Sequence, residues 1–288
     1  MARTNRLSAL SDDILLKHIL SKISYRDVVR SSLLSQRWRF LWKKIPDLVF
    51  CCQDFEKQKD DKIQAIIDNA LLHHDARLCW LNLQIAMDDP KTANMNNWIR
   101  LAAEKQVERM ALLISYRDPK TGERIENSSM VDIGDSVFKC ENLTTLQLKF
   151  INLPKIPTDF GVFRYLKTFF CFDMPNVDDA TFKGFMDLCP HLRNLGICGC
   201  LRLKNLNIHS CILMYLNLGI VRPNMSLQMV CPQLTEISLI DCGRYQGLKL
   251  LQGISRGESV KKIILQNYSR GNAVNPGIPS ITVVVPLP

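Results

Sequence analysis

The 288-residue sequence has no run of about 18 consecutive apolar residues, the length that a membrane-spanning helix needs. Its first ten residues, MARTNRLSAL, contain no apolar core of the kind that a secretory leader carries. We therefore expect no transmembrane helix and no leader, and we place the chain in the nucleus, the cytoplasm or both. The eleven cysteines are odd in number and scattered, which favours reduced thiols over a disulfide framework.

Motifs for catalysis and cofactor binding are missing as well. There is no Gly-rich phosphate loop, no Gly-x-Ser-x-Gly nucleophile turn and no paired-histidine metal motif. We therefore expect a protein that is not an enzyme and has no cofactor and no metal site. His73-His74-Asp75 has no matching cluster of ligands nearby and is interpreted as a surface turn at a helix end. Cys198-Gly199-Cys200 lacks a second ligand pair at zinc spacing, and we expect core thiols there.

The net charge of +9 is unevenly distributed along the chain. Residues 1–50 hold ten basic and four acidic side chains, a net of +6, which leaves +3 for the other residues. The nearly neutral remainder argues against nucleic acid, which attracts broadly basic surfaces. A basic first segment would speed the encounter with an acidic partner, although a solvated basic surface explains the charge nearly as well.

Residues 6–50 predict three short helices. Ser11, Ser24 and Ser35 each precede a helical apolar pattern and can cap it, and Ile45-Pro46 ends the third helix. A piece this small cannot bury all of its aliphatic and tryptophan side chains internally. Some of them should therefore face a partner protein or the rest of the chain.

The same segment resembles the F-box, whose pattern runs Leu-Pro-Asp-Glu-Ile-Leu, Ile-Leu-Ser, Val-Arg-Thr-Ser-Val-Leu-Ser, Arg-Trp and Leu-Trp. The matching stretches are 10–15, 19–21, 29–35, 37–38 and 41–42, with serine in place of proline at positions 11 and 24. The resemblance implies docking to the Skp-type adaptor of a cullin-based ubiquitin ligase, an adaptor family that is acidic. Some apolar residues of the motif must instead hold it together or face the rest of the chain. The adaptor-binding set that the resemblance implies is Leu10, Ile14, Leu15, Ile19, Leu20, Val28, Leu34, Trp38, Leu41 and Trp42.

From residue 78 onward one phrase recurs: an apolar residue, any two residues, an apolar residue, any one residue and a third apolar residue. Most copies start 20–29 residues apart, as in leucine-rich repeats, in which a strand from each repeat points alternate side chains into a stacked core. Helical patterns over 97–104 and 179–188 lie between strands. Starts only 11 and 10 residues apart around Leu203 predict repeats that return by tight turns alone. The nine copies are Leu78/Leu81/Leu83, Val107/Met110/Leu112, Leu143/Leu146/Leu148, Leu166/Phe169/Cys171, Leu192/Leu195/Ile197, Leu203/Leu206/Ile208, Leu213/Leu216/Leu218, Leu234/Ile237/Leu239 and Val260/Ile263/Leu265.

Six cysteines fall at fixed places in this phrase. Cys140, Cys189 and Cys231 lie three residues before its first position, and Cys200, Cys211 and Cys242 lie three residues after its last, where leucine-rich repeats often turn Asn or Cys inward. The F-box, a helix near residue 72, a Trp98-centred helix and Cys-Pro-x-Leu repeats together resemble the plant F-box/LRR family that often carries an FBD region. The chain instead closes with NPGIPSITVVVPLP, in which Ile281–Val285 is β-prone. This tail either caps the last repeat or marks a truncated or spliced product.

The sequence thus predicts an α/β protein: an N-terminal three-helix F-box at 5–50, a linker at 51–62, an irregular leucine-rich-repeat solenoid at 63–270 and an atypical tail at 271–288 in which the FBD region is absent. The implied function is substrate recognition in a Skp-cullin-F-box ubiquitin ligase, with an unknown target protein and neither nucleic acid nor membrane as partner. The alternatives are an interaction scaffold outside any ligase and, less favoured, a nucleic-acid-binding protein. Strand alternation turns the expected target-binding residues outward: Trp80, Arg109, Gln147, Phe170, Asn194, Asn207 and Tyr215.

Overall fold

The computed structural model shows a mixed α/β protein whose main strands run parallel, and it forms two compact units, Met1–Leu143 and Thr144–Pro288. Each unit is described by itself. The structure describes residues 6–56, 58–118, 120–121, 124–125, 130–156, 161–174, 176–220, 225–240, 260, 262–266 and 283–285.

The first unit begins with short helical segments that follow the predicted caps. The Ser11 hydroxyl accepts from the Ile14 N–H at 3.4 Å, and the Ser24 hydroxyl accepts from the Asp27 N–H at 3.2 Å. Ser35 differs, because its carbonyl rather than its side chain accepts from the first N–H groups of the third stretch. The segments are η1 (Arg6–Ala9), α1 (Asp12–Ile14), the π-helical η2 (Leu15–Ile19), η3 (Leu20–Lys22), α2 (Tyr25–Ser31) and the 3-10 helix η4 (Trp38–Lys44).

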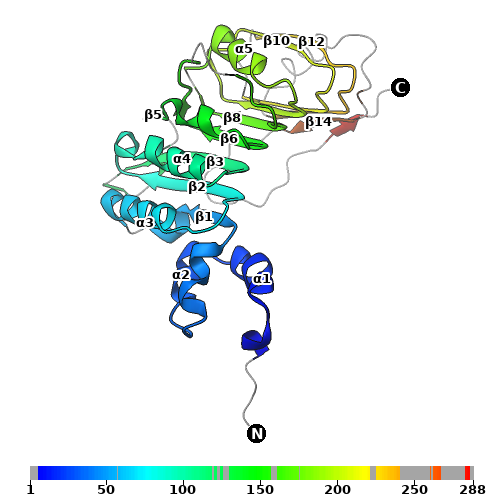
Figure 1. Cartoon of the computed structure of the whole chain (residues 1–288). Helices are drawn as coiled ribbons and strands as arrows, with labels where there is room; N and C mark the ends of the chain where they lie inside the picture. Colours follow the sequence, from blue (N-terminus) through cyan, green and yellow to red (C-terminus); the bar gives the residue numbers. More distant parts are fainter. Residues whose placement is uncertain are drawn as a thin grey trace. The chain divides into compact units, whose positions relative to one another are not determined.

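Three parallel strands form the sheet of this unit: β1 (Asp47–Cys51), β2 (Trp80–Met87) and β3 (Arg109–Arg117). Two amphipathic helices, α3 (Asp60–Leu72) and α4 (Met95–Glu104), cover one face of it (Figure 1). The short elements are η5 (Cys52–Phe55), η6 (Pro90–Thr92), β4 (Arg124–Ile125), which is antiparallel to β3, β5 (Val131–Asp132) and η7 (Asp135–Lys139).

Strand β1 and the segment after it were not predicted. Residues 51–62, interpreted as a linker, contain η5, whose Phe55 is buried, and the first turn of α3. The buried Arg117 holds this segment in place, donating to the carbonyls of Phe55, Glu56 and Gln58 and to the Asp88 carboxylate at 2.7 Å. A signal for β1 was present, because Ile45, Leu48 and Phe50 repeat the apolar phrase one copy earlier than Leu78.

The loop at residues 73–75 also differs from its interpretation as a surface turn. His73 is exposed, but His74 is buried, and its Nε2 donates to the Ile45 carbonyl at 2.7 Å. The Asp75 N–H donates to the Lys43 carbonyl at 2.8 Å. The end of α3 is therefore bonded to the end of η4, so this loop joins the helical segments to the sheet.

The main sheet of the second unit confirms most of the repeats. Its parallel strands pair in the order β6 (Thr145–Lys149), β8 (Thr168–Phe172), β9 (Asn194–Cys198), β11 (Tyr215–Gly219), β13 (Glu236–Ile240) and β14 (Lys262–Gln266). The apolar positions of the phrase fall in register across them, as with Phe169, Leu195 and Leu216. Strand β15 (Val283–Val285) is antiparallel to β14, and β7 (Ile151–Asn152) is a short strand after β6.

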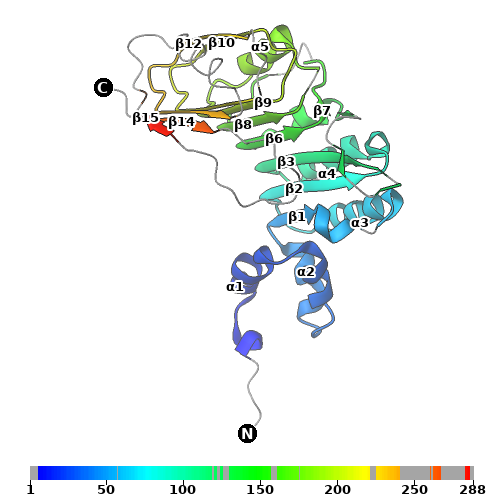
Figure 2. The same ribbon diagram turned by 180° about the vertical axis from the view of Figure 1, so that it is seen from behind.

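The repeat at Leu203 was placed wrongly. Strand β9 pairs directly with β11, whereas β10 (Asn205–His209) pairs with β12 (Ser226–Val230) in a separate two-stranded sheet. This sheet and helix α5 (Asp179–Asp187) form a second layer over the main sheet (Figure 2). The intervals of 11 and 10 residues are thus two halves of one 21-residue repeat that returns by a strand. A strand rises about 3.3 Å per residue against 1.5 Å for a helix, so it crosses the layer in fewer residues.

The cysteines follow the corrected register. Cys200 is buried as predicted, whereas Cys198, also expected to be a core thiol, is only half-buried. Cys140, Cys189 and Cys231 are buried as well, and burial raises the pKa of the Cys140 thiol to about 12. Cys211 is exposed, against the prediction, because it follows a second-layer strand and not a strand of the main sheet. Cys242 lies outside the described residues. The described cysteines are free thiols.

Candidate interaction surfaces

The helical segments before β1 expose several large apolar side chains. Leu33 is 88% exposed and Leu34 is 67% exposed, directly after α2, and Phe40 of η4 is 57% exposed. Ile14, Ile23 and Val29 are exposed to a lesser degree. Large apolar residues gathered on a small module are costly to leave in water, so this surface is suited to binding another protein.

The ten residues implied as the adaptor-binding set separate into two groups. Leu15, Leu20, Val28, Trp38 and Leu41 are buried, so they hold the helical segments together. Of the other five, Ile14 and Leu34 are exposed, and Leu10, Ile19 and Trp42 are half-buried. These five remain available to a partner.

Leu33 and Phe40 were missed as surface residues. The third stretch was interpreted with α-helical spacing, which aligns Trp38, Leu41 and Trp42. It is a 3-10 helix with three residues per turn, so Trp38 and Leu41 share the buried face and Phe40 turns outward. Leu33 lies two residues beyond Ser31, the last residue of α2, so helical periodicity no longer applies to it.

An ion pair joins the first and third helical stretches. The Arg37 guanidinium lies 2.8 Å (Nε) and 2.6 Å (Nη2) from Oδ1 of Asp12, and Nη2 also donates to the Leu10 carbonyl. Both side chains are partly exposed, so the pair contributes little stability by itself. The pair links a residue two positions before Ile14 to a residue three positions after Leu34.

On the first unit's sheet, two of the predicted target-binding residues contact each other. Trp80 and Arg109 are register partners on β2 and β3, and the Arg109 guanidinium lies 4.9 Å from the Trp80 ring centroid. Arg109 also pairs with Asp47 of β1 at 3.4 Å. The three strands together present an aromatic ring with a cation over its face.

On the second unit's sheet, four predicted residues lie on neighbouring strands. Gln147 and Phe170 are register partners, as are Asn194 and Tyr215. The Phe170 ring lies over Gly196 of β9, where a Cβ would be only 1.9 Å from Cδ1 of the ring. Glycine therefore leaves the space that this half-buried ring occupies.

Asn207, the remaining predicted target-binding residue, does not belong to this surface. It is exposed on β10, in the second layer. Strand alternation alone assigned it outward, and the assignment to the main sheet was wrong because the strand itself lies in the other sheet.

No helix in the described part of the chain is both long and apolar enough to cross a bilayer. No group of three or more His, Cys, Asp or Glu side chains there is arranged to hold a metal ion.

Two stretches of the chain match models of known protein families. Residues 7–50 match the F-box domain model. Residues 95–255, more than half of the chain, match the model described as "FBD-associated F-box protein At5g56370, LRR repeats".

The relatives are proteins of Arabidopsis thaliana. F-box/FBD/LRR-repeat protein At5g56420 is 28% identical over 197 residues, covering 68% of this chain and 44% of its own length. FBD-associated F-box protein At5g56370 is 30% identical over 187 residues, covering 65% and 41%. F-box/LRR-repeat protein At3g26922 is 29% identical over 197 residues, covering 66% and 58%. The chain therefore spans about half the length of these relatives, and it belongs to the family of FBD-associated F-box proteins with leucine-rich repeats.

Proposed function

We propose that the chain is a substrate-recognition subunit of a Skp-cullin-F-box ubiquitin ligase. In this proposal the F-box docks a Skp-type adaptor, and the strands of the repeats bind a target protein. The target's lysines would then be held near the conjugating enzyme that carries ubiquitin. This raises their effective concentration at that enzyme, and the present chain needs no catalytic residue. The single observation that supports the proposal most is the exposed apolar set on a segment that matches the F-box model.

We infer further that the helical stretches of residues 12–44 form the three-helix unit of the F-box and that the repeats stack as a solenoid. The buried group led by Trp38 and Leu41 supplies the interior of the helical unit. The parallel register from β6 to β14 within the second unit is what stacked repeats require. We place the complex in the nucleus or the cytoplasm, which imaging of a tagged full chain would test.

For the target, we propose the sheet faces that carry Trp80 and Arg109 in the first unit and Phe170 and Tyr215 in the second. Aromatic and arginine side chains supply most of the binding energy at protein interfaces. The Phe170 ring is already ordered on Gly196, so little side-chain entropy would be lost when it binds.

Copurification of the full chain with a Skp-type adaptor tests the first half of the proposal. We expect the wild-type chain to retain the adaptor, and Leu34→Asp or Phe40→Asp to weaken binding by at least about tenfold, since each places a charge in an apolar contact. Both side chains are exposed, so neither change should unfold the chain. Leu201→Asp is the matched control, because Leu201 is an exposed leucine of the second unit, 46% exposed.

Equal adaptor binding by the wild type, Leu34→Asp and Phe40→Asp would contradict the proposed docking surface. A folded wild-type chain that recovers no adaptor would instead favour an interaction scaffold outside any ligase. Circular dichroism of each variant confirms that the comparison is between folded proteins.

A further inference from the structure

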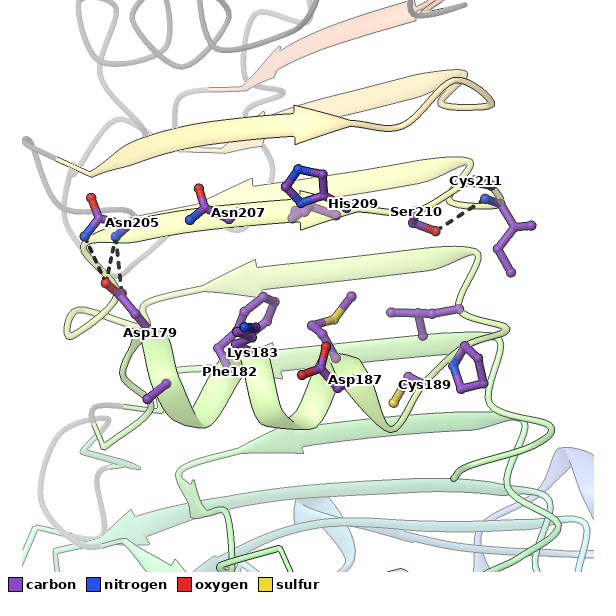
Figure 3. Close-up of a pocket in the computed structure, with 16 residues that line it drawn as sticks. Asp179, Phe182, Lys183, Asp187, Cys189, Asn205, Asn207, His209, Ser210 and Cys211 are labelled. Atoms are coloured by element: carbon purple, nitrogen blue, oxygen red, sulfur yellow. Dashed lines mark hydrogen bonds between the residues drawn. The ribbon is translucent and has the colours of Figure 1, made fainter. Parts of the chain in front are cut away.

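The second layer of the Thr144–Pro288 unit changes from a helix to strands between α5 and β10, and a groove of about 970 Å³ lies at this change. Figure 3 shows Phe182, Lys183 and Asp187 of α5 on one side and Asn205, Asn207 and His209 of β10 on the other. The buried side chains of Phe182, Leu192 and Ile208 contribute apolar surface to its lining. The groove arises because a helix satisfies its own backbone and cannot pair with the edge of a strand.

The main-chain N–H and carbonyl groups of β10 point alternately toward β12 and toward the groove. The Ser226 N–H donates to the Lys204 carbonyl, and the Ser210 N–H donates to the Val230 carbonyl, so even-numbered residues of this stretch bond to β12. In a parallel ladder the residues between them point to the opposite edge. The N–H and carbonyl groups of Asn205, Asn207 and His209 therefore face α5.

A hydrogen bond from the Asn205 N–H to α5 confirms that this row of groups faces the helix. The Asn205 N–H donates to the Asp179 carboxylate at 3.2 Å, and Asp179 also accepts from the Lys204 N–H at 2.7 Å. These bonds close one end of the groove. Within the described residues, the main-chain groups of Asn207 and His209 that face α5 have no partner.

We propose that this groove binds an extended peptide segment of a partner protein, which adds as a strand to the free edge of β10. The chemistry that complements an unpaired row of N–H and carbonyl groups is another main chain, as in β-strand addition. Three charged side chains of α5 line the groove: Lys183, Asp187 and Asp179, whose carboxylate is already bonded to the Lys204 and Asn205 N–H groups. That leaves one basic and one acidic side chain to meet a peptide, so charge does not select it. The side chains that the bound peptide turns into the groove would be apolar, because they would contact Phe182 and Leu192. This site is separate from the F-box and from the main sheet, and it does not depend on the proposed ligase function.

A displayed library of random peptides about ten residues long, selected on the full chain, supplies the probe. The recovered peptides are then labelled, and their binding is measured by fluorescence anisotropy. Asn207→Pro removes the N–H that faces the groove, and we expect it to weaken binding by about tenfold or more. Asn207→Ala keeps this N–H and loses only the side chain, so we expect affinity within about twofold of the wild type if the main chain is recognised.

Asn207→Pro should fold, because proline is tolerated on an edge strand where its missing N–H would not pair with the neighbouring strand. Thermal unfolding checks this. A second measurement needs no variant: amide hydrogen exchange on the wild type should slow at Asn207 and His209 when the peptide is bound.

Several results would overturn the proposal. They are the failure of the library to yield any binding peptide, equal binding to the wild type and Asn207→Pro, equal loss in Asn207→Pro and Asn207→Ala, and exchange at the two amides that the bound peptide leaves unchanged. Loss of binding in Phe170→Ala, with Asn207→Pro unaffected, would place the peptide on the main sheet.

Discussion

Individual residues show how the chain departs from the F-box pattern without losing its local structure. Ser11 and Ser24 stand where the pattern has proline, and their φ angles are −67° and −61°. These values lie in the range that a proline ring imposes, about −65°. Serine therefore keeps the backbone that proline would set and adds a side-chain cap to the helix that follows.

His74 is a buried residue whose charge state affects stability. Burial lowers the pKa of His74 below its ordinary 6.5, and the nearby Lys105 ammonium acts in the same direction, while the Ile45 carbonyl and Asp75 oppose it. The folded chain therefore prefers the neutral imidazole. The unfolded chain binds the proton more readily, so the stability that His74 contributes is complete above about pH 6.5 and falls as the pH drops below it.

We predict that the free energy of unfolding decreases between pH 7 and pH 5, with a His74 contribution of at most about 1.4 kcal/mol per pH unit. Urea unfolding of the full chain at a series of pH values measures this slope. His74→Gln keeps a donor for the Ile45 carbonyl but does not titrate, so its slope should be shallower. Identical slopes for the two proteins would show that His74 does not control acid stability.

Among the secondary-structure elements, β1 and β10 differ most from what the sequence predicted. The F-box segment ends in β1, whose Leu48 and Phe50 are buried and whose register pairs Phe50 with Leu83. The Tyr25 ring of α2 lies 4.7 Å from the Phe50 ring. The helices and the first repeats therefore share packing through one strand.

This arrangement predicts different outcomes for two truncations. Deleting residues 1–50 removes Leu48 and Phe50, each worth about 1.5–3 kcal/mol of burial, and exposes the edge of β2. Deleting residues 1–44 keeps β1 in the sheet. We expect the longer deletion to aggregate and to unfold at lower urea concentration than the shorter one, as measured by size-exclusion chromatography and urea titration. Equal behaviour of the two truncations would mean that β1 is dispensable.

For the whole molecule, the uneven charge is the feature that bears on association. Residues 1–50 carry a net +6, and Lys22, Arg26, Arg39 and Lys44 are among the exposed basic side chains. Such a surface attracts an acidic partner and so accelerates the encounter. Salt weakens this attraction, because at 0.1 M it screens exposed charges that are more than about 10 Å apart.

On the proposed function, we predict that the association rate constant with a Skp-type adaptor falls roughly tenfold as the salt concentration rises from about 0.05 to 0.5 M. Stopped-flow fluorescence measures this rate. The double variant Lys22→Glu and Arg26→Glu should show a weaker salt dependence, with a smaller effect on the dissociation rate. A rate constant that salt leaves unchanged would show that the basic surface has no steering role.

Elements that depend on local periodicity and capping could be predicted from the amino-acid sequence. The helix caps at Ser11 and Ser24, the helices around Trp98 and Phe182, and eight of the nine repeat phrases all lie where the pattern placed them. Each of these depends on the side chains of a few neighbouring residues, which the sequence contains directly.

The layer that each strand joins, and the apolar residues that remain exposed, could not be predicted without the three-dimensional fold. Leu206 and Ile208 of β10 alternate like a main-sheet strand, and only their pairing with β12 shows that they belong to the second layer. Likewise, Leu15 and Leu34 are equally apolar, yet one is buried and the other is 67% exposed. Hydrogen-bond partners and burial depend on residues far apart in the chain, and the alternation of apolar residues is the same for either sheet.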